Sequence, residues 1–240
     1  MELLIYWSIY ARIYNRAMKS PKITVIIPAY NNERHIKRCV NSVLSQTYKN
    51  IEIVIIDDNS TDKSVNIIEQ IRREYPEIIL LCQDDHKELY HARMDAISKA
   101  SGDYIAMVSG GDYVSRDYFR TIMRVLVETD ADIAINDIIE EKSDGRRIIP
   151  SLAYNNIQFD KLENDDILNR YFEQEGLNNL WSIVESKICK KEIWDKALPY
   201  LGQQTEHITT AENIIFSSVL MYYAKKILKL IMHHTTAAVT

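Results

Sequence analysis

The sequence predicts an α/β fold in which helices cover both faces of a mostly parallel central sheet. Short β-branched runs alternate with amphipathic stretches between residues 21 and 136, which is the pattern that builds a parallel sheet. The runs are apolar throughout, so the strands must be covered on both faces. The chain has 240 residues, of which 46% are hydrophobic and 26% charged, and is long enough to bury such a core. We therefore expect a three-layer αβα sandwich.

Five β-branched runs are predicted to be strands: 23–28, 51–57, 78–82, 104–108 and 132–136. The stretches between them repeat apolar residues at helical spacing and are predicted to be helices: 33–46, 62–74, 87–100 and 115–128. Residues 137–240 are expected to continue the same domain. There, 140–147 (EEKSDGRR) indicates an exposed turn, mostly helical material follows, and a helix over 211–224 precedes an apolar run at 227–232.

Residues 1–20 are predicted to form an amphipathic helix. Positions 3–18 are apolar and aromatic but contain Arg12 and Arg16, and no run approaches the roughly 20 apolar residues that span a bilayer. This helix is expected to lie on a membrane surface, or to pack on its own domain or on a second copy of the chain. No cleavage site typical of a signal peptide follows it, so we expect a cytoplasmic protein, free or peripheral at the inner face of the membrane.

Composition excludes several classes of function. The net charge of -5 gives no electrostatic footprint for nucleic acid. The 6 glycines form neither a Rossmann nor a P-loop motif. The 3 cysteines are too far apart for a zinc ribbon and are typical of a reducing compartment. Of these, Cys39 and Cys82 are expected to be small buried residues.

Polar residues gather where the predicted strands end, and this edge is where open α/β sheets bind ligands. Pro28 fixes the backbone ahead of Tyr30, whose ring could stack on a flat base. The carboxylate of Asp58 could accept a hydrogen bond from a uracil N–H. Alternatively, the polar run at 58–61 merely turns the chain and caps the next helix.

Three motifs, IPAYN, SVLSQTY and IDDNSTD, occur in this order within residues 23–64. Their sequence and spacing resemble the opening of the family 2 nucleotide-sugar glycosyltransferases, which have the GT-A fold. ELYHARMDAISKASGDYIAMV (88–108) continues the resemblance, which covers about residues 22 to 224. It implies an inverting transfer of a sugar from a nucleotide diphosphate, with a UDP-sugar as the expected donor, to a polysaccharide or lipid-linked acceptor.

The resemblance assigns donor binding to Pro28, Tyr30, Asn31, Asp58, Arg93, Gly110 and Gly111. Arg93 follows Ala92 in a helix whose neighbouring residues are expected to be buried. Its guanidinium group could donate two hydrogen bonds to a phosphate or to the edge of a nucleobase. Alternatively, Arg93 forms a surface ion pair with Glu88 or Asp95. SKICKKEIW (186–194) and AENIIF (211–216) resemble acceptor-side motifs less closely.

Residues near those motifs carry a weaker expectation. The resemblance implies that Glu185, Lys187 and Lys190 line an acceptor groove, and the alternative is a solvated helix face.

The metal-binding pattern of the family is incomplete in this sequence. Relatives hold Mg²⁺ or Mn²⁺ with an Asp-x-Asp motif after the fourth strand, usually followed by another Asp, and hard cations prefer such carboxylates. This chain has Ser109-Gly110-Gly111-Asp112, so Asp112 alone remains as a weak candidate ligand. His233 or His234 could add a further ligand.

The general base is replaced as well. A Glu-Asp pair provides it in the family, and Glu212-Asn213 stands there in this chain. An amide cannot take a proton near neutral pH, so Glu212 would have to replace the base. The sequence leaves open an active glycosyltransferase with unusual ligands and a pseudoenzyme that binds a nucleotide or glycan, or partners an active relative. A nucleotidylyltransferase is disfavoured because its glycine-rich basic loop is missing.

Overall fold

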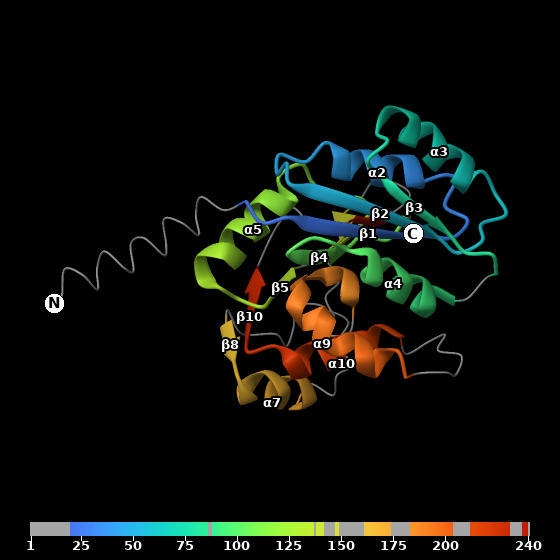
Figure 1. Ribbon diagram of the computed structural model, residues 1–240. Helices are drawn as coiled ribbons and strands as arrows, with labels where there is room; N and C mark the ends of the chain where they lie inside the picture. Colours follow the sequence, from blue (N-terminus) through green and yellow to red (C-terminus); the bar gives the residue numbers. More distant parts are fainter. Residues whose placement is uncertain are drawn as a thin grey trace.

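The computed structural model describes residues 20–85, 88–136, 138–141, 147–148, 161–173, 183–203, 212–230 and 237–239. Their centre is an 8-stranded sheet with the strand order β3-β2-β1-β4-β9-β5-β10-β8. Helices pack on both faces of this sheet, as Figure 1 shows. The predicted three-layer architecture with a mostly parallel sheet is therefore confirmed.

All five predicted strands form, with ends that differ by at most one residue. They are β1 (Ile23–Ala29), β2 (Ile51–Asp57), β3 (Ile79–Cys82), β4 (Tyr104–Met107) and β5 (Ile133–Asn136). The four predicted helices also form, as α2 (Ile36–Leu44), α3 (Ser64–Glu74), α4 (Glu88–Lys99) and α5 (Tyr118–Thr129). Strand β1 pairs in parallel with β2 and with β4, so the carboxyl ends of these strands meet at one edge of the sheet.

The chain after residue 137 is less helical than the sequence indicates. It contains β6 (Ile139–Glu141), β7 (Arg147–Ile148), β8 (Lys161–Glu163), α7 (Asp165–Glu173), the 3₁₀ turn η1 (Val184–Ser186), β9 (Lys187–Lys190), α9 (Lys191–Leu201), α10 (Glu212–Tyr223), β10 (Lys226–Leu230) and β11 (Ala237–Val239). The expected exposed turn at 140–147 is wrong at both ends, because these residues enter β6 and β7, which pair antiparallel. The expected helix over 211–224 is confirmed as α10.

Strand β9 was not expected. It runs antiparallel between β4 and β5, in the middle of the sheet, and continues the backbone hydrogen-bond ladder between them. Lys187, its first residue, is only 2% exposed. The expectation of a solvated helix face at this segment is therefore wrong.

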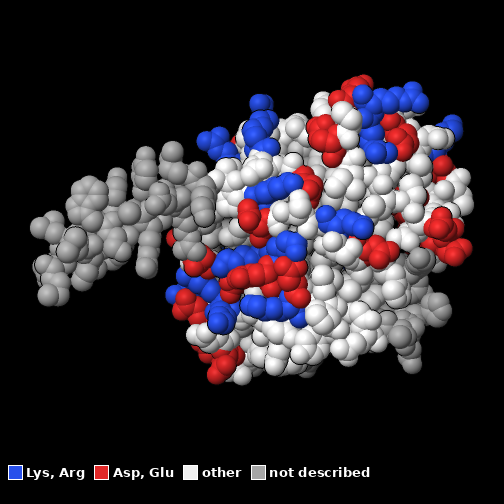
Figure 2. Space-filling model, in the orientation of Figure 1, with Lys and Arg blue, Asp and Glu red and all other residues white. Residues whose placement is uncertain are grey.

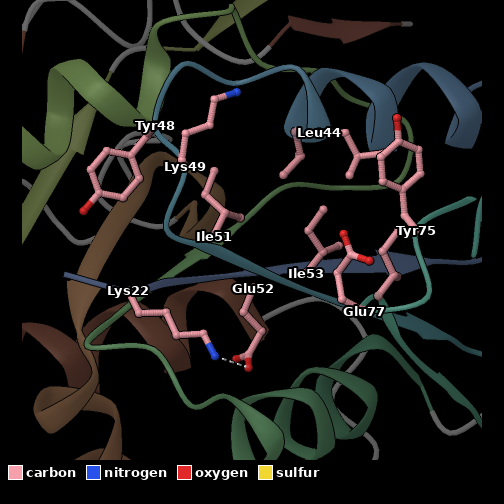
Figure 3. A pocket seen from close by; sticks show the side chains of 11 residues that line it. Lys22, Leu44, Tyr48, Lys49, Ile51, Glu52, Ile53, Tyr75 and Glu77 are labelled. Atoms are coloured by element: carbon pink, nitrogen blue, oxygen red, sulfur yellow. Dashed lines mark hydrogen bonds and ion pairs between the residues drawn. The ribbon is translucent and has the colours of Figure 1, made fainter. Parts of the chain in front are cut away.

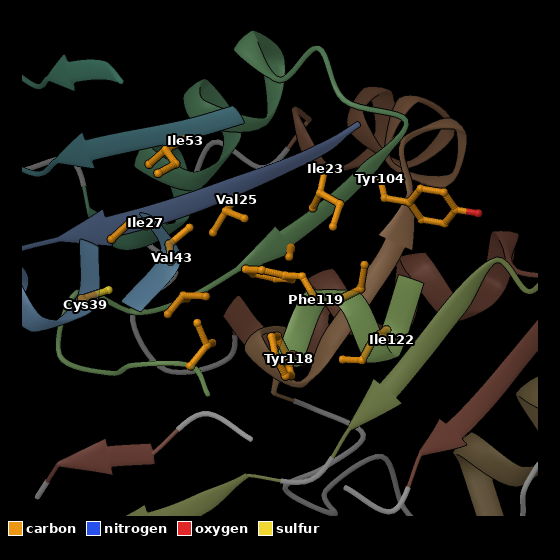
Figure 4. Packing of buried hydrophobic residues seen from close by; sticks show 14 of the residues in the cluster. Ile23, Val25, Ile27, Cys39, Val43, Ile53, Tyr104, Tyr118, Phe119 and Ile122 are labelled. Carbon is orange, nitrogen blue, oxygen red and sulfur yellow. The ribbon is translucent and has the colours of Figure 1, made fainter. Parts of the chain in front are cut away.

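Two apolar clusters fill the spaces on either side of the sheet. Successive residues of a strand point to opposite faces, so β1 contributes Val25 and Ile27 to one cluster and Ile26 to the other. Figure 4 shows the first cluster, in which the β1 side chains face Phe119 and Ile122 of α5. Burial on both faces explains why these strands are apolar throughout.

Charges on the surface are mixed. Figure 2 shows Lys and Arg side chains interspersed with Asp and Glu on the face that it draws. Ion pairs of this kind join Lys190 to Asp130 at 3.0 Å and to Asp132 at 2.8 Å. Within the described residues, no helix has the length and apolar character needed to cross a bilayer. The proposed N-terminal helix lies outside the described residues, apart from its last position.

Candidate functional site

Two cavities lie at the amino ends of the strands. One, of about 310 Å³, is lined by Tyr48 and by the ion pair between Lys22 and Glu52, whose atoms are 2.7 Å apart (Figure 3). The second, of about 480 Å³, lies on the other side of Tyr48, against Met123 of α5. Ligands of open α/β sheets bind at the opposite edge, so the candidate site must be built from the residues at the carboxyl ends.

The loops after β1 and β2 are hydrogen-bonded to each other at that edge. Asn31 has a left-handed backbone with φ of 50°, and its Oδ1 accepts a hydrogen bond from the N–H of Thr61 at 2.9 Å. In return, its N–H donates to Oγ of Ser60 at 2.9 Å. Asp57 closes the second loop by accepting hydrogen bonds from the N–H and Oγ of Ser60. The run at 58–61 does turn the chain, with Asn59 in the left-handed region at φ of 61°, but it does not cap α3, whose N-cap is Lys63 without a side-chain hydrogen bond. Asn31 joins the two loops.

Tyr30 and Asp58 follow directly on neighbouring strands. Ala29 and Asp57 are register partners, so the next residue of each chain segment lies at the same edge. Tyr30 is 45% exposed, which leaves ring surface for stacking, whereas Asp58 is 2% exposed. A base stacked on the tyrosine and hydrogen-bonded by the carboxylate fits this pair, and the donor-binding role remains a prediction for both.

The turn after β4, residues 109–112, is packed closely against the end of β1. The N–H of Gly110 donates to the carbonyl oxygen of Pro28 at 2.9 Å, and the N–H of Asp112 donates to Ser109 at 2.9 Å. A Cβ atom on Gly110 would lie 2.6 Å from Oδ1 of Asn32, so any other residue there would force Asn32 to move. At Gly111, the nearest atom to such a Cβ is 3.9 Å away, which leaves room for a side chain.

Asp112 is the carboxylate of this turn. Burial and, to a smaller extent, the negative charge of Glu185 together raise the pKa of its side chain to about 7. Glu185 belongs to η1, directly before β9. Because Ala106 of β4 pairs with Ile188 of β9 in antiparallel register, η1 lies at the carboxyl end of β4, beside the turn.

Arg93 joins this edge to α10. It is 2% exposed, and its Nη1 donates hydrogen bonds to Oε1 of Glu212 at 3.2 Å and to Oδ1 of Asn213 at 2.9 Å. Its Nη2 forms an ion pair with Glu185. Within the described part of the chain, Nε is buried and has no hydrogen-bond partner.

The surface ion pair considered as the alternative role of Arg93 is wrong, because the side chain is buried and its partners come from η1 and α10. Asp95, one of the partners considered, instead accepts a hydrogen bond from Gln83 at 2.8 Å. The expected burial of Ala92 beside Arg93 is confirmed. We call Arg93, Glu185, Glu212 and Asn213 the Arg93 cluster.

From the sequence, Glu185 was considered for an acceptor groove or a solvated helix face, and its pairing with Arg93 was missed. Its segment, VESKICK, carries charged residues that suggest solvent, yet Lys187 directs its Nζ to the carbonyl oxygen of Ile183 at 2.5 Å. Burial lowers the pKa of Lys187 to about 7. A buried lysine satisfied by a local carbonyl leaves no signal in the sequence pattern.

The donor groups at the edge do not fit a divalent cation. Among the residues that the structure describes, no group of three or more His, Cys, Asp and Glu residues is placed to hold a metal ion. The turn offers one carboxylate, Asp112, and one hydroxyl, Ser109, where Mg²⁺ or Mn²⁺ prefers several carboxylate oxygens. His233 and His234, the further ligands considered, lie outside the described residues.

Comparisons with known proteins agree with this architecture. The family model described as "Glycosyl transferase family 2" matches residues 24–187. The chain is 30% identical over 179 residues to the glycosyltransferase GlyG of Streptococcus pneumoniae, covering 74% of this chain and 59% of that protein. It is 32% identical over 215 residues to the poly(ribitol-phosphate) beta-glucosyltransferase of Bacillus spizizenii, covering 86% of this chain and 30% of that protein.

Among solved structures, S. aureus TarS 1-349 in complex with UDP-GlcNAc superimposes with a TM-score of 0.72 at 22% identity, covering 91% of this chain and 58% of that one. The chain thus spans less than two thirds of the length of each of these proteins. The family match includes the strand ends, Arg93 and Glu185, and ends before α10. This chain belongs to glycosyl transferase family 2, and its α/β domain has the GT-A fold.

Proposed function

We propose that this chain binds a nucleotide-diphosphate sugar at the carboxyl edge of the sheet and transfers the sugar to a glycan or lipid-linked acceptor. The observation that carries the proposal is the Arg93 cluster. By holding the first turn of α10, Arg93 brings the carboxylate of Glu212 to the edge where Tyr30 and Asp58 are expected to bind the nucleobase. The proposed donor site and a candidate general base thus lie at one edge.

UDP is the nucleotide that we propose for the donor. A carboxylate at Asp58 matches the N–H of uracil, and Tyr30 presents an exposed ring for stacking. The likeness to TarS, which was solved with UDP-GlcNAc, supports the same nucleotide. The likeness to a poly(ribitol-phosphate) glucosyltransferase supports a cell-surface polymer as the acceptor class.

Glu212 is the base that we propose for the transfer. An acceptor hydroxyl attacks the anomeric carbon of the sugar, the bond from that carbon to the diphosphate oxygen breaks, and the hydroxyl proton passes to Glu212. The new bond forms on the face opposite the leaving group, which inverts the anomeric centre. Asn213, whose amide accepts from Arg93 at 2.9 Å, cannot take this proton.

Release of UDP from UDP-GlcNAc and other UDP-sugars, with a panel of glycan acceptors, tests this proposal. Because a positioned base contributes about 10²–10⁴ in rate, Glu212→Gln should lower UDP release by that factor. Glu192→Gln is the matched control, since Glu192 lies in the first turn of α9 and is exposed. An unchanged rate for Glu212→Gln would show that another group is the base.

A second candidate function is a nucleotide-binding or glycan-binding subunit that does not turn over. The amide of Asn213, in the position where the resemblance implies the base, specifically favours it. In that case, the chain binds UDP-sugars without releasing UDP, and Asn213→Asp creates release. The same assay, run beside a binding measurement, separates the two functions.

A further inference from the structure

The turn at 109–112 has few oxygen atoms left for a cation. The carbonyl oxygen of Ser109 accepts hydrogen bonds from the N–H of Asp112 at 2.9 Å and from Sγ of Cys39 at 3.3 Å. The carbonyl oxygen of Pro28 accepts from Gly110 at 2.9 Å. The carbonyl oxygens of Ser109 and Pro28 are therefore already engaged, which makes them poorer replacements for the missing carboxylates.

Side chains cannot supply the missing ligands either. A Cβ atom at Gly110 would lie 2.6 Å from Oδ1 of Asn32 and 3.1 Å from the carbonyl oxygen of Pro28. Ser109 carries a neutral hydroxyl, and Gly111 carries no side chain. Asp112 is the single carboxylate of the turn.

A cation that the protein holds with one carboxylate should add little to the affinity of the protein for the nucleotide. A divalent cation already binds a diphosphate in solution, so it strengthens the protein complex only through its contacts with the protein. Among the residues that the structure describes, the turn supplies one such contact, the carboxylate of Asp112. The net charge of the site is consistent with this. A divalent cation and two ligating carboxylates together add no net charge, and Ser109 and Gly111 without a cation add none either.

We propose that this chain binds a nucleoside diphosphate independently of divalent cations. The inference rests on the proposed function, since it concerns the donor site named there. It goes beyond that function because it assigns diphosphate recognition to groups of the protein alone. Restoring one carboxylate at Gly111, where a Cβ atom has 3.9 Å of clearance, should create the dependence that the native turn lacks.

The test is titration calorimetry of UDP, GDP and CDP into the full chain, once in excess Mn²⁺ and once in excess EDTA. For the native chain, the dissociation constants in the two buffers should agree within about threefold. Gly111→Asp should bind at least about tenfold more tightly in Mn²⁺ than in EDTA. Gly111→Ala is the matched control, because it fills the same space without a carboxylate and should behave as the native chain. Circular dichroism checks that each variant is folded.

Three results overturn the inference. If the native chain binds at least about tenfold more tightly in Mn²⁺, then the cation is required and only this inference fails. If Gly111→Asp is as indifferent to Mn²⁺ as the native chain, then this turn is not where a cation would meet the diphosphate. If none of the nucleotides binds in either buffer, then the proposed function fails and takes the inference with it.

Discussion

Replacing Arg93 with methionine should remove a substantial part of the free energy of unfolding of this domain. Arg93 is 2% exposed, and the side chains of its acidic partners Glu185 and Glu212 are 9% and 12% exposed. Removing one partner of a buried ion pair leaves uncompensated charge and costs about 3–5 kcal/mol. Domains of this kind are stable by only about 5–15 kcal/mol, so the loss is readily measured.

Equilibrium urea unfolding followed by far-UV circular dichroism measures this loss. Arg72→Met on α3 is the control, because Arg72 pairs with Glu69 at 2.8 Å on the surface. An exposed pair of that kind is worth about 1 kcal/mol or less. Arg72→Met also removes the hydrogen bond that its Nε donates to the carbonyl oxygen of Ile78 at 3.0 Å, so the difference between the two variants is a lower bound on the effect of burying the charge.

A double variant tests the physical cause. In Arg93→Met combined with Glu185→Gln, one of the two orphaned carboxylates becomes neutral, so the double variant should be more stable than Arg93→Met alone. Coupling between contacting residues is typically about 0.5–3 kcal/mol, and we expect a recovery in that range. If Arg93→Met lowers the free energy of unfolding by less than about 1 kcal/mol, or if adding Glu185→Gln lowers it further, then the buried ion pairs of Arg93 do not stabilise the fold as the distances indicate.

Three further predictions concern the surroundings of the site. Gly110→Ala forces its Cβ against Asn32 and should cost about 1–3 kcal/mol, whereas Gly111→Ala should be nearly neutral, and thermal unfolding of the two variants checks the contrast. Partial burial acts to raise the pKa of Glu52, but hydrogen bonds from three neighbours outweigh it and lower the pKa from 4.5 to about 2. The stabilisation from Glu52 is therefore full above pH 4.5 and is lost as the pH falls toward 2. After solvent screening it amounts to about 1.5 kcal/mol. The melting temperature of Glu52→Gln should therefore fall less over this pH range than that of the native chain. Asp132→Ala should cost about 1–3 kcal/mol, because its Oδ2 accepts hydrogen bonds from the N–H groups of Lys225 and Lys226, at the start of β10, at 2.8 and 3.1 Å. An unfolding curve that matches the native one would contradict this.

The parallel half of the sheet could be predicted from the sequence because each strand is buried on both faces. A run such as 51–57 is apolar over most of its length and is bounded by turn residues, which gives a strong local signal. The order of the strands in the sheet is not local information. Cys82 shows this, because it was expected to be buried and is exposed. It ends β3, which lies at the edge of the sheet with β2 as its one neighbour.

The antiparallel strand β9 could not be predicted for the same reason. Its four residues include two lysines, and such a short polar run resembles a surface segment. Tertiary contacts set its position between β4 and β5, and the pairing of Arg93 with Glu185, 92 residues apart, follows from that position. The strand ends, by contrast, were predictable as a group, because parallel strands bring their carboxyl ends to one edge regardless of their order.

The resemblance implies carboxylates at positions 109, 111 and 213, and this chain has none there, which makes the edge less negative. Ser109 and Gly111 lie in the turn that we expect to face the diphosphate. Asn213 lies beside Glu185 and Glu212, which already share the guanidinium of Arg93. A carboxylate at position 213 would be the third around Arg93, and repulsion from the other two would disfavour its charged form. The amide instead accepts the Arg93 hydrogen bond at 2.9 Å without adding charge. The absence of carboxylates at positions 109, 111 and 213 is therefore electrostatically consistent, since each absence lowers the repulsion that the proposed diphosphate would meet at this edge.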